Sequence, residues 1–349
     1  MSDAAPPVAV LGASGYTGGE LVRLLLSHPG VEITYLGVRE PEGRSIDQIH
    51  PFLAGAADLK LGDLSAEAAS EKAEFAFLAM PHGLSAGIAP KLLEAGVRVV
   101  DLAGDFRLPA DEYPAWYGFE HPAAAWLEKA VYGLPELFAD RVAGASLVAN
   151  PGCYPTPAVL GLAPLLMAGL ITPDPVVVDG KSGLSGAGKA LTESTSFAAS
   201  DESVRPYKFP RHQHTPEIEH VLGLATGHTV RASFVPHLVP QVRGVLVTSY
   251  ATLAGDVTTE TLTDALAEAY DAAPFVRVLP AGAMADTKRV WGSNVVELQA
   301  AADPRTGKAI VVGALDNLVK GAAGQAVQNF NIMAGQDETT GLSSVGVYP

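Results

Sequence analysis

The N-terminal segment places a strand, a glycine-rich turn and a helix in an order that few folds accommodate. Val8–Leu11 is apolar throughout, and Gly12, Gly15 and Gly18 follow it before the apolar helical stretch 20–26. In a Rossmann-type unit the first glycine permits the tight turn, the second lets the backbone approach a pyrophosphate, and the third brings the helix close to the sheet. The segment therefore predicts an α/β dinucleotide-binding domain, with a glycine-rich turn that binds nothing as the alternative.

The cofactor-binding candidates lie in this turn and at the end of the following strand. Those of the turn are Gly12, Ser14, Gly15, Tyr16, Thr17 and Gly18. The apolar strand Val31–Val38 ends at Arg39, where an NAD-binding protein would place the Asp or Glu that binds a ribose 2′-hydroxyl. Because a guanidinium pairs with a 2′-phosphate, Arg39 favours NADP over NAD. An ordinary surface arginine is the alternative interpretation.

The remaining pattern indicates two domains of different class, as a length of 349 residues also suggests. Strand, helix and strand alternate over 75–79, 83–95 and 97–102, which is the rhythm of a doubly wound sheet. In the second half of the chain strands dominate, and one helix is expected over Thr259–Ala272. The expected strands are 176–179, 230–235, 244–253, 276–279, 294–301 and 309–312. We therefore expect a Rossmann-type domain over 1–150 and, over 151–314, an α+β catalytic domain with a largely antiparallel sheet.

Composition excludes several classes of partner. A net charge of −15 argues against a nucleic-acid surface and against an anionic membrane. No apolar run approaches the roughly 18 residues of a spanning helix, and residues 1–7 lack both the basic residues and the apolar core of a signal peptide. One cysteine allows no internal disulfide. We expect a soluble, cytoplasmic protein.

The single cysteine, Cys153, lies where a strand gives way to a helix. Ser146–Ala149 suits a buried strand, 158–170 suits a helix, and Pro155 suits its first turn. At such a terminus the free backbone amides and the positive end of the helix dipole stabilise a thiolate, which lowers the pKa of the thiol. The same amides could bind an oxyanion. A lone cysteine is otherwise a small buried apolar residue. Its context favours a nucleophile.

Two further segments carry polar side chains suited to chemistry. Gly180–Lys189 follows a strand and is rich in glycine, serine and lysine, but it lacks the spacing of an ATP-binding P-loop. Its amides and hydroxyls suit a phosphate or a nicotinamide amide, and a plain flexible loop is the alternative.

His212 and His214 are candidates for a general base beside a thiolate. Thr215 and Pro216 look like a helix cap and first-turn pair, so His214 is expected to precede a helix. The histidine spacing does not support a metal site, and none is expected.

Together these motifs resemble the N-acetyl-gamma-glutamyl-phosphate reductase family of arginine biosynthesis, within the aspartate-semialdehyde dehydrogenase-like group. The resemblance covers essentially the whole chain and rests on residues 12–19, 105–108, 150–156, 181–188, 212–218, 236–240 and 316–329. It implies that Cys153 is the nucleophile and His214 the acid/base, with His212 as the second candidate. It also implies that a C-terminal helix, 315–349, returns to complete the cofactor domain.

The resemblance implies a reaction that the residues themselves support. Cys153 attacks an acyl phosphate, phosphate leaves, and the thioester accepts a hydride from NADPH on the way to the semialdehyde. Arg107, Asn150 and Lys181 are the candidates for holding phosphate or carboxylate. Ser182 is a candidate for the same task or for the cofactor, with Gly183. Asn317 either binds the nicotinamide amide or caps a helix. A small-molecule substrate and a homo-oligomer, dimer or tetramer, are expected.

Other functions fit parts of the pattern. A related acyl-phosphate reductase would act on aspartyl phosphate or on a carrier-bound aminoadipyl phosphate, although the net charge of −15 disfavours an acidic carrier. A thiol hydrolase would need Cys153 and His214 but no cofactor, so the glycine turn argues against it. A nonenzymatic NADP-binding sensor would not need the cysteine.

Overall fold

The computed structural model describes residues 5–41, 43–56 and 59–349, which form two compact units. Unit 1 comprises Met1–Pro151 with Ala322–Leu342, and unit 2 comprises Gly152–Gly321 with Ser343–Pro349. Residues 1–4, which belong to the expected cofactor domain and to the N-terminal start, lie outside the described residues. Each unit contains its own seven-stranded sheet.

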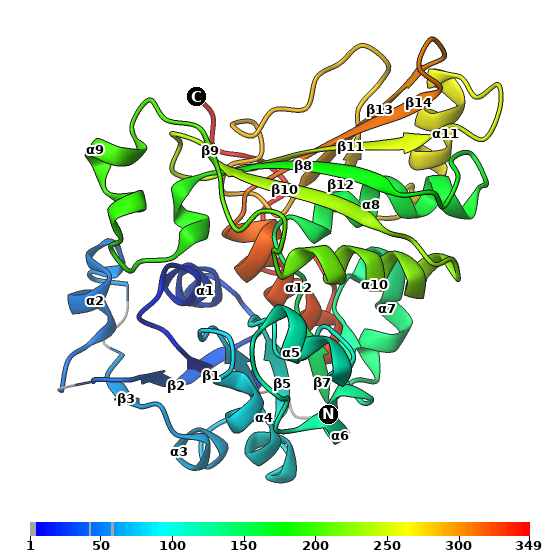
Figure 1. Cartoon of the computed structure of the whole chain (residues 1–349). Helices are drawn as coiled ribbons and strands as arrows, with labels where there is room; N and C mark the ends of the chain where they lie inside the picture. The colour runs from blue at the N-terminus through cyan, green and yellow to red at the C-terminus, as the bar shows by residue number, and fades with distance from the viewer. Residues whose placement is uncertain (1–4, 42, 57–58) are drawn as a thin grey trace. The chain divides into compact units, whose positions relative to one another are not determined.

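Unit 1 is built on a parallel sheet in the strand order β3-β2-β1-β4-β5-β7-β6 (Figure 1). Its strands are β1 (Pro7–Leu11), β2 (Glu32–Val38), β3 (Leu61–Asp63), β4 (Phe75–Leu78), β5 (Arg98–Asp101), β6 (Val131–Tyr132) and β7 (Leu147–Ala149). Its helices are α1 (Tyr16–Leu26), α2 (Ile46–Ile49), α3 (Ala66–Ser70), α4 (Ser85–Glu94), α5 (Tyr113–Trp116), α6 (Ala124–Leu127), α7 (Pro135–Ala143) and α12 (Gly324–Met333). The Rossmann-type domain predicted from the sequence is confirmed.

Strand alternation sends successive side chains of β4 to opposite faces of this sheet. Phe75 and Phe77 both pack against Phe330 of α12, with ring centroids 5.0 and 5.6 Å apart. Ala76 and Leu78 join the buried cluster formed with α3 and α4. The sheet is therefore covered on both faces, which suits the nearly unbroken apolar sequence of its strands.

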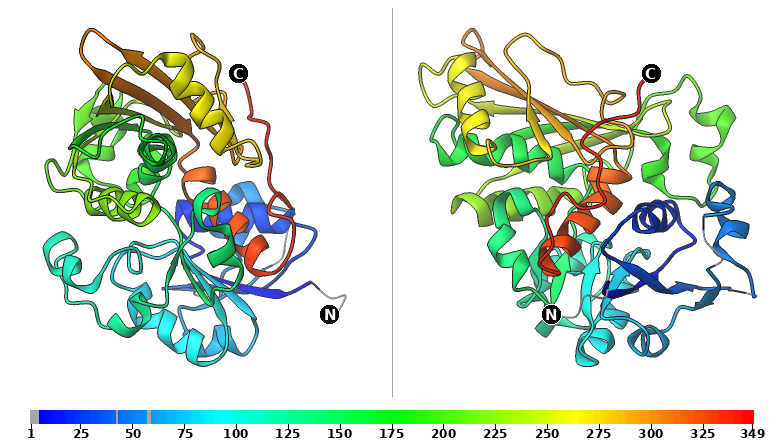
Figure 2. Two further views of the ribbon diagram at one scale, coloured as in Figure 1. Left: turned by 90° about the vertical axis from the view of Figure 1, so that its right-hand side faces the viewer. Right: turned by 180° about the vertical axis from the view of Figure 1, so that it is seen from behind.

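The returning helix is shorter than the expected span 315–349. After β14, residues Val319–Ala323 form a π-helical turn, α12 occupies Gly324–Met333, and Gly335 and Gly341 adopt positive φ. Such glycines interrupt a helix. The helix α12 contacts α1 and α7 within unit 1, and Figure 2 shows it in red.

Unit 2 contains a mixed, largely antiparallel sheet in the order β12-β13-β14-β11-β8-β10-β9. Its strands are β8 (Val176–Ser182), β9 (Arg205–Pro206), β10 (Ala232–Leu238), β11 (Val245–Thr252), β12 (Val276–Val278), β13 (Val296–Asp303) and β14 (Lys308–Leu315). Its helices are α8 (Pro155–Met167), α9 (Phe197–Ser200), α10 (His214–Thr226) and α11 (Thr259–Ala269). The predicted α+β class is confirmed.

One face of this second sheet is covered by α8, α10 and α11 (Figures 1 and 2). The central helix α8 is buried along nearly its whole length, from Pro155 to Leu166. Gly161 and Gly313 allow this close packing, since a Cβ atom at either would lie 2.7 Å from a side-chain atom across the helix–sheet boundary. The start of α8 is thereby held rigidly against the sheet.

Candidate active site

Cys153 lies half-buried just before α8, at the start of unit 2. Gly152 O accepts hydrogen bonds from the backbone N–H of Thr156 at 3.2 Å and from its Oγ1 hydroxyl at 3.0 Å, which ties the cysteine loop, Gly152–Tyr154, to the helix. Gly321 approaches so closely that a Cβ atom there would lie 2.9 Å from Cys153 Cβ. The helix terminus predicted from the proline pattern is present, and its dipole favours a thiolate.

His214 lies against the cysteine loop. A Cβ atom added to Gly152 would lie 2.5 Å from His214 Nε2, so the imidazole occupies the space beside the residue that precedes Cys153. His212 has a different place, because its Nδ1 accepts the backbone N–H of His214 at 3.1 Å. His212 therefore caps α10, whereas the Nε2 of His214 faces the cysteine loop.

The start of α10 differs from the expected one. The helix begins at His214 itself, with Gln213 as the preceding residue, and Thr215 donates its N–H to His212 O at 2.9 Å. Thr215 does not cap the helix, because it already lies inside the first turn of α10. His214 thus stands inside the first turn, where the helix fixes its direction.

Glu217 also belongs to this site, although the sequence predicts no role for it. Its side chain is fully buried, and Oε1 accepts the backbone N–H of Gly152 at 2.7 Å. Oε2 lies 3.9 Å from His214 Nε2. The sequence signal was available, because residues three apart on a helix share a face and His214 and Glu217 have that spacing.

Two tyrosines complete the surroundings of the cysteine. Tyr207 OH donates to Tyr154 OH at 3.3 Å, and Tyr154 OH donates to His237 O at 3.2 Å. Burial raises the pKa of both phenols well above the usual value; nearby negative charges, that of Cys153 included, raise both further. The phenols therefore stay protonated. His212 packs edge-on against both rings. No sequence pattern linked Tyr207 to Cys153.

Lys181 and Ser182 lie on opposite faces of β8 because strand side chains alternate. A Cβ atom at Gly180 would lie 2.4 Å from the Tyr154 ring, so residues 180 and 182 face α8. Lys181 points to the other face, where its Nζ pairs with Asp179 Oδ2 at 2.9 Å. The structure does not bring Lys181 together with Cys153. Ser182 is buried on the helix-covered side, and its hydroxyl donates to Gly183 O at 3.0 Å.

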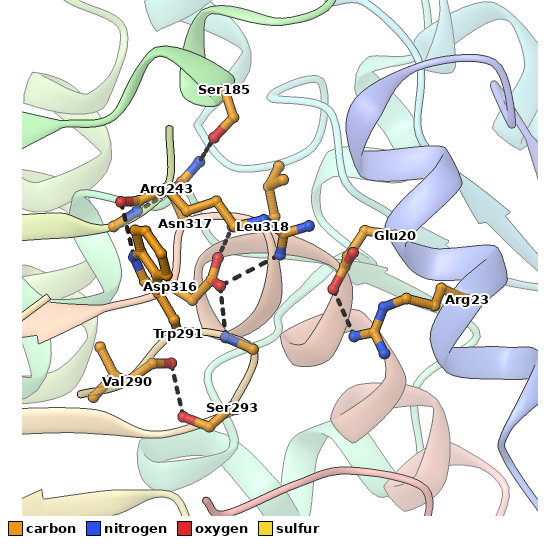
Figure 3. A network of polar contacts seen from close by, with 12 residues as sticks. Glu20, Arg23, Ser185, Arg243, Val290, Trp291, Ser293, Asp316, Asn317 and Leu318 are labelled. Carbon is orange, nitrogen blue, oxygen red and sulfur yellow. Dashed lines mark hydrogen bonds and ion pairs between the residues drawn. The ribbon is translucent and has the colours of Figure 1, made fainter. Parts of the chain in front are cut away.

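Asn317 braces the glycine-rich loop after β8 and caps no helix (Figure 3). Its Oδ1 accepts the Gly244 N–H at 2.7 Å, and its Nδ2 donates to Ser185 Oγ at 2.9 Å. Gly183 N donates to Gly244 O at 2.9 Å. The adjacent Asp316 accepts the N–H groups of Gly292 and Leu318, each at 2.9 Å. The loop is therefore anchored on both sides, unlike a plain flexible loop.

In unit 1 the glycine turn has the geometry that a dinucleotide turn requires. Gly12 has φ +92°, and a Cβ atom there would lie 2.3 Å from Ala79 O. A Cβ atom at Gly18 would lie 2.3 Å from Gly12 O. Gly15 is open by comparison. It stands at the N-cap position of α1, where it supplies no side chain to bind the first-turn amides, which include those of Tyr16 and Thr17. This suits an anionic group.

The end of β2 adjoins this turn. Gly37 O accepts the Gly12 N–H at 2.8 Å, and the exposed Arg39 follows two residues later. Ser14 and Thr17 are partly exposed at the start of α1, and Tyr16 is exposed. The structure therefore groups the expected cofactor residues of the first unit at one end of β1 and β2.

Arg107 and Asn150 are buried in unit 1 and bind backbone groups there. Arg107 donates from Nε to Asn150 O at 2.7 Å and from Nη2 to Leu102 O at 2.9 Å. Asn150 donates to Ala322 O at 3.1 Å and accepts from Asn329 at 3.0 Å. Both side chains hold together the segment that leads into the cysteine loop, and their roles as phosphate or carboxylate ligands stay predictions.

Curated relatives resemble the chain over nearly its full length. The N-acetyl-gamma-glutamyl-phosphate reductase of Magnetococcus marinus is 47% identical over 98% of both chains, and that of Symbiobacterium thermophilum is 47% identical over 98% of this chain and 99% of the relative. The chain belongs to the N-acetyl-gamma-glutamyl-phosphate reductase family. Family models agree: residues 7–145 match the semialdehyde dehydrogenase NAD binding domain, and 153–317 match the semialdehyde dehydrogenase dimerisation domain.

Solved structures show how widely this fold is shared beyond the reductase family. The aspartate semialdehyde dehydrogenase II of Vibrio cholerae, complexed with ASA, aligns with a TM-score of 0.74 over 95% of this chain and 98% of that one, at 17% identity. The Candida albicans aspartate semialdehyde dehydrogenase with NADP aligns with a TM-score of 0.70 over 95% of this chain and 99% of that one, also at 17% identity.

Within the described residues no helix is both long and apolar enough to cross a membrane.

One family motif, Asp105 to Leu108, lies beside a buried acid whose protonation affects stability. Asp101 ends β5, is fully buried, and accepts the Ala103 N–H at 3.2 Å. Burial, followed by the charge of Asp105, raises the pKa of Asp101 from 3.8 to about 7. The folded protein therefore holds a proton that the unfolded chain releases, and stability falls as pH rises from about 4 to about 7.

Replacing Asp101 with asparagine should remove this pH dependence. Asn keeps the acceptor for Ala103 and carries no charge, so D101N should be more stable than the wild type at pH 8, on the order of 1–3 kcal/mol, and this advantage should shrink at pH 5. Urea unfolding at both pH values measures the difference. D140N, at an exposed position on α7, is the control. An advantage that is equal at pH 5 and pH 8 would contradict the assignment.

Proposed function

We propose that this chain reduces N-acetyl-gamma-glutamyl phosphate to N-acetylglutamate 5-semialdehyde and phosphate with NADPH, in arginine biosynthesis. The observation that carries the proposal is the placement of His214 Nε2 against Gly152, beside the single cysteine at the start of α8. Relatives 47% identical over nearly the whole chain bear this reductase name. The reaction class is oxidoreduction of the phosphorylating aldehyde dehydrogenase type.

The first half of the reaction needs a thiolate and a proton acceptor. Cys153 Sγ forms a bond to the acyl carbon, the carbon–oxygen bond to phosphate breaks, and phosphate leaves with its electron pair. His214 accepts the thiol proton, and the positive end of α8 stabilises the sulfur anion. Gly152 already donates its N–H to Glu217, so donors to the substrate oxyanion must come from elsewhere in the site.

NADPH, when bound, supplies the hydride that converts the Cys153 thioester to a thiohemiacetal. Protonated His214 then gives its proton to the new oxyanion, and takes it back as the carbon–sulfur bond breaks and the aldehyde leaves. The thiolate of Cys153 is thereby restored. His212 accepts the backbone N–H of His214 and so keeps His214 in place at the start of α10.

The residues of the glycine turn fit a dinucleotide. Gly12 and Gly18 are closed to any larger side chain, and Gly15 leaves room beside the first amides of α1. We propose that Gly12, Gly15 and Gly18, with Ser14, Tyr16 and Thr17, hold the pyrophosphate, and that Arg39 holds the 2′-phosphate. Ser182, Gly183 and Asn317 are proposed at the nicotinamide end, with Asn317 bracing the loop that carries the other two.

Replacing Arg39 with alanine should reduce the preference for NADP. Loss of a charge-assisted pair with the 2′-phosphate should raise the KM for NADP about tenfold or more and leave that for NAD nearly unchanged. Initial rates with both nucleotides measure this ratio. R141A is the control: it removes an exposed arginine from α7, which adjoins the opposite edge of the sheet. This variant should keep the wild-type ratio of the KM values for NADP and NAD. An unchanged NADP preference in R39A would remove Arg39 from the site.

The activity itself is tested in reverse. Purified protein is incubated with N-acetylglutamate semialdehyde, phosphate and NADP, and NADPH formation is followed by its absorbance. Parallel reactions contain aspartate semialdehyde or a carrier-bound aminoadipate semialdehyde. Absence of phosphate-dependent turnover with the acetylated substrate overturns the proposal. Turnover of an acyl substrate without nucleotide would indicate the thiol hydrolase, and NADP binding without turnover would indicate the sensor.

We also propose that the chain works as a homo-oligomer, a dimer or a tetramer. Residues 153–317 match a model described as a dimerisation domain. The face of the second sheet opposite α8 exposes Val177 and Tyr250, at 45% and 38%. Sedimentation equilibrium measures the mass. A cytoplasmic location stays a prediction from the sequence.

A further inference from the structure

Lys208 presents an ammonium group beside the two histidines of the site. Its Nζ donates to Gln213 Oε1 at 3.2 Å, and Gln213 stands between His212 and His214 at the start of α10. The preceding residue, Tyr207, packs edge-on against the His212 ring, with ring centroids 5.4 Å apart. Lys208 is exposed, and its backbone has φ +46°, which a non-glycine residue rarely adopts. The structure therefore places an exposed cation next to the candidate acid/base.

The segment that carries Lys208 is fixed close to Cys153. The strand β9 pairs with β10, and Tyr207 donates its N–H to a carbonyl of β10 at 3.1 Å. The hydroxyl of Tyr207 donates to that of Tyr154, the residue after Cys153, at 3.3 Å. Burial, followed by the negative charge of Cys153, raises the pKa of Tyr207, so the phenol lies within electrostatic reach of the sulfur. A charge on the next residue thus stands near the reacting thiol.

No described residue forms an ion pair with Lys208, whose ammonium contacts a neutral amide oxygen instead. Residues 203–216 contain neither Asp nor Glu, in a chain whose net charge is −15. By contrast, Lys181 on β8 pairs with Asp179 at 2.9 Å. A cation that no carboxylate neutralises attracts an anion to the surface around it. The chemistry proposed for Cys153 brings such an anion, the acyl phosphate, to this place.

We propose that Lys208 binds the phosphoryl group of the substrate while Cys153 attacks the acyl carbon, and holds the phosphate that leaves. The proposal rests on the reductase function proposed above. A lysine ammonium is a compact point charge, which binds a phosphate oxygen without the planar match that a guanidinium makes. Its attraction strengthens as the carbon–oxygen bond breaks, because the departing phosphate gains negative charge.

Lys308 provides a matched control in the same unit. Its Nζ also donates to a neutral side-chain oxygen, that of Thr252, at 2.9 Å. Lys308 is the first of the eight residues of β14, which span about 24 Å. Cys153 lies near the other end of this strand, because Gly321, which approaches it closely, donates its N–H to Asp316 O at 2.9 Å. The two lysines share their charge and kind of contact, and they differ in their distance from the thiol.

The test measures how well inorganic phosphate protects Cys153 from alkylation by iodoacetamide at constant ionic strength. The chain has one cysteine, so every labelled thiol is Cys153. In K208Q the phosphate concentration for half-protection should rise about tenfold, because a charge-assisted contact is lost. K208R keeps the charge and should stay within about threefold of the wild type, and K308Q should match it. K208N, a second neutral variant whose residue type adopts positive φ more readily, should behave as K208Q.

Kinetics in the reverse direction separate the phosphate from the carboxylate of the cosubstrate. In K208Q the KM for phosphate should rise about tenfold, whereas the KM for N-acetylglutamate semialdehyde should stay within about twofold of the wild type. A raised KM for the semialdehyde with an unchanged KM for phosphate would assign Lys208 to the carboxylate and overturn the proposal.

Unchanged protection by phosphate in both K208Q and K208N would also overturn the proposal, and so would a wild type that phosphate does not protect. Protection needs neither the semialdehyde nor NADP, so it tests Lys208 even if the chain reduces a different acyl phosphate. Wild-type protection that K208Q loses, together with no turnover of N-acetylglutamate semialdehyde, would support the phosphate site and contradict only the proposed substrate.

Discussion

Replacing Cys153 with alanine should abolish phosphate-dependent turnover, lowering kcat by about 10⁵-fold or more. No other thiol exists in the chain, so no second cysteine can replace the nucleophile. Removal of a covalent nucleophile costs more than removal of any single positioning contact, because the two-step route through the thioester is lost altogether. The residual rate should then reflect binding alone.

The measurement follows NADPH formation from N-acetylglutamate semialdehyde, phosphate and NADP in the wild type, C153A and C153S. NADP binding, measured by fluorescence titration, should be the same in all three, which separates lost chemistry from lost folding. C153S retains a hydroxyl of similar size but is a far weaker nucleophile at neutral pH. Turnover by C153A above about 1% of the wild type would refute the nucleophile assignment.

Replacing Gly12 with alanine should destabilise unit 1 by about 3 kcal/mol. At φ +92° an alanine is strained, and its Cβ would lie 2.3 Å from Ala79 O and 2.7 Å from the Ala79 carbonyl carbon. Both are backbone atoms of the segment after β4, so relief requires moving a central strand of the sheet. Urea unfolding of the purified variant measures the loss, and NADP affinity should fall with it.

The matched variant is G15A, three residues along the same turn. Gly15 has φ −77° and ψ 171°, which any residue adopts, and a Cβ atom there meets nothing closer than Gly12 O at 3.8 Å. We expect a stability change within about 1 kcal/mol but roughly tenfold weaker NADP binding, since a methyl group would stand where the pyrophosphate must approach. Equal destabilisation in G12A and G15A would show that the contact with Ala79 is not decisive.

Several features of the site could be predicted because they depend on neighbours in the sequence. The proline-flanked cysteine at the start of a helix follows from local conformational preferences, and so does the glycine turn after β1. The two-domain class follows from the change of hydrophobic pattern along the chain. Asn317 is ambiguous in the sequence, because a turn that braces a loop and a helix cap have the same local sequence signal.

The contacts of Lys181, Arg107 and Glu217 depend on segments that are distant in the sequence. The choice of face for Lys181 depends on which side of β8 the helices cover. The guanidinium of Arg107 donates to the carbonyl groups of Asn150 and Leu102, contacts that no local pattern indicates, and its role as an anion ligand stays a prediction. Glu217 lies 65 positions from Gly152 in the sequence, and nothing in either segment alone indicates that they meet.

Short-range patterns alone establish the reactive groups and much of their local backbone setting: a single thiol at a helix start, two histidines close to another helix start, and a glycine turn that suits a dinucleotide. Those follow from residue type and short-range geometry. Packing between distant segments sets which histidine faces the cysteine loop, which side of the sheet each residue of β8 occupies, and the bond between Glu217 and the Gly152 amide. Such contacts form when distant segments pack around a shared core, and so no local pattern encodes them.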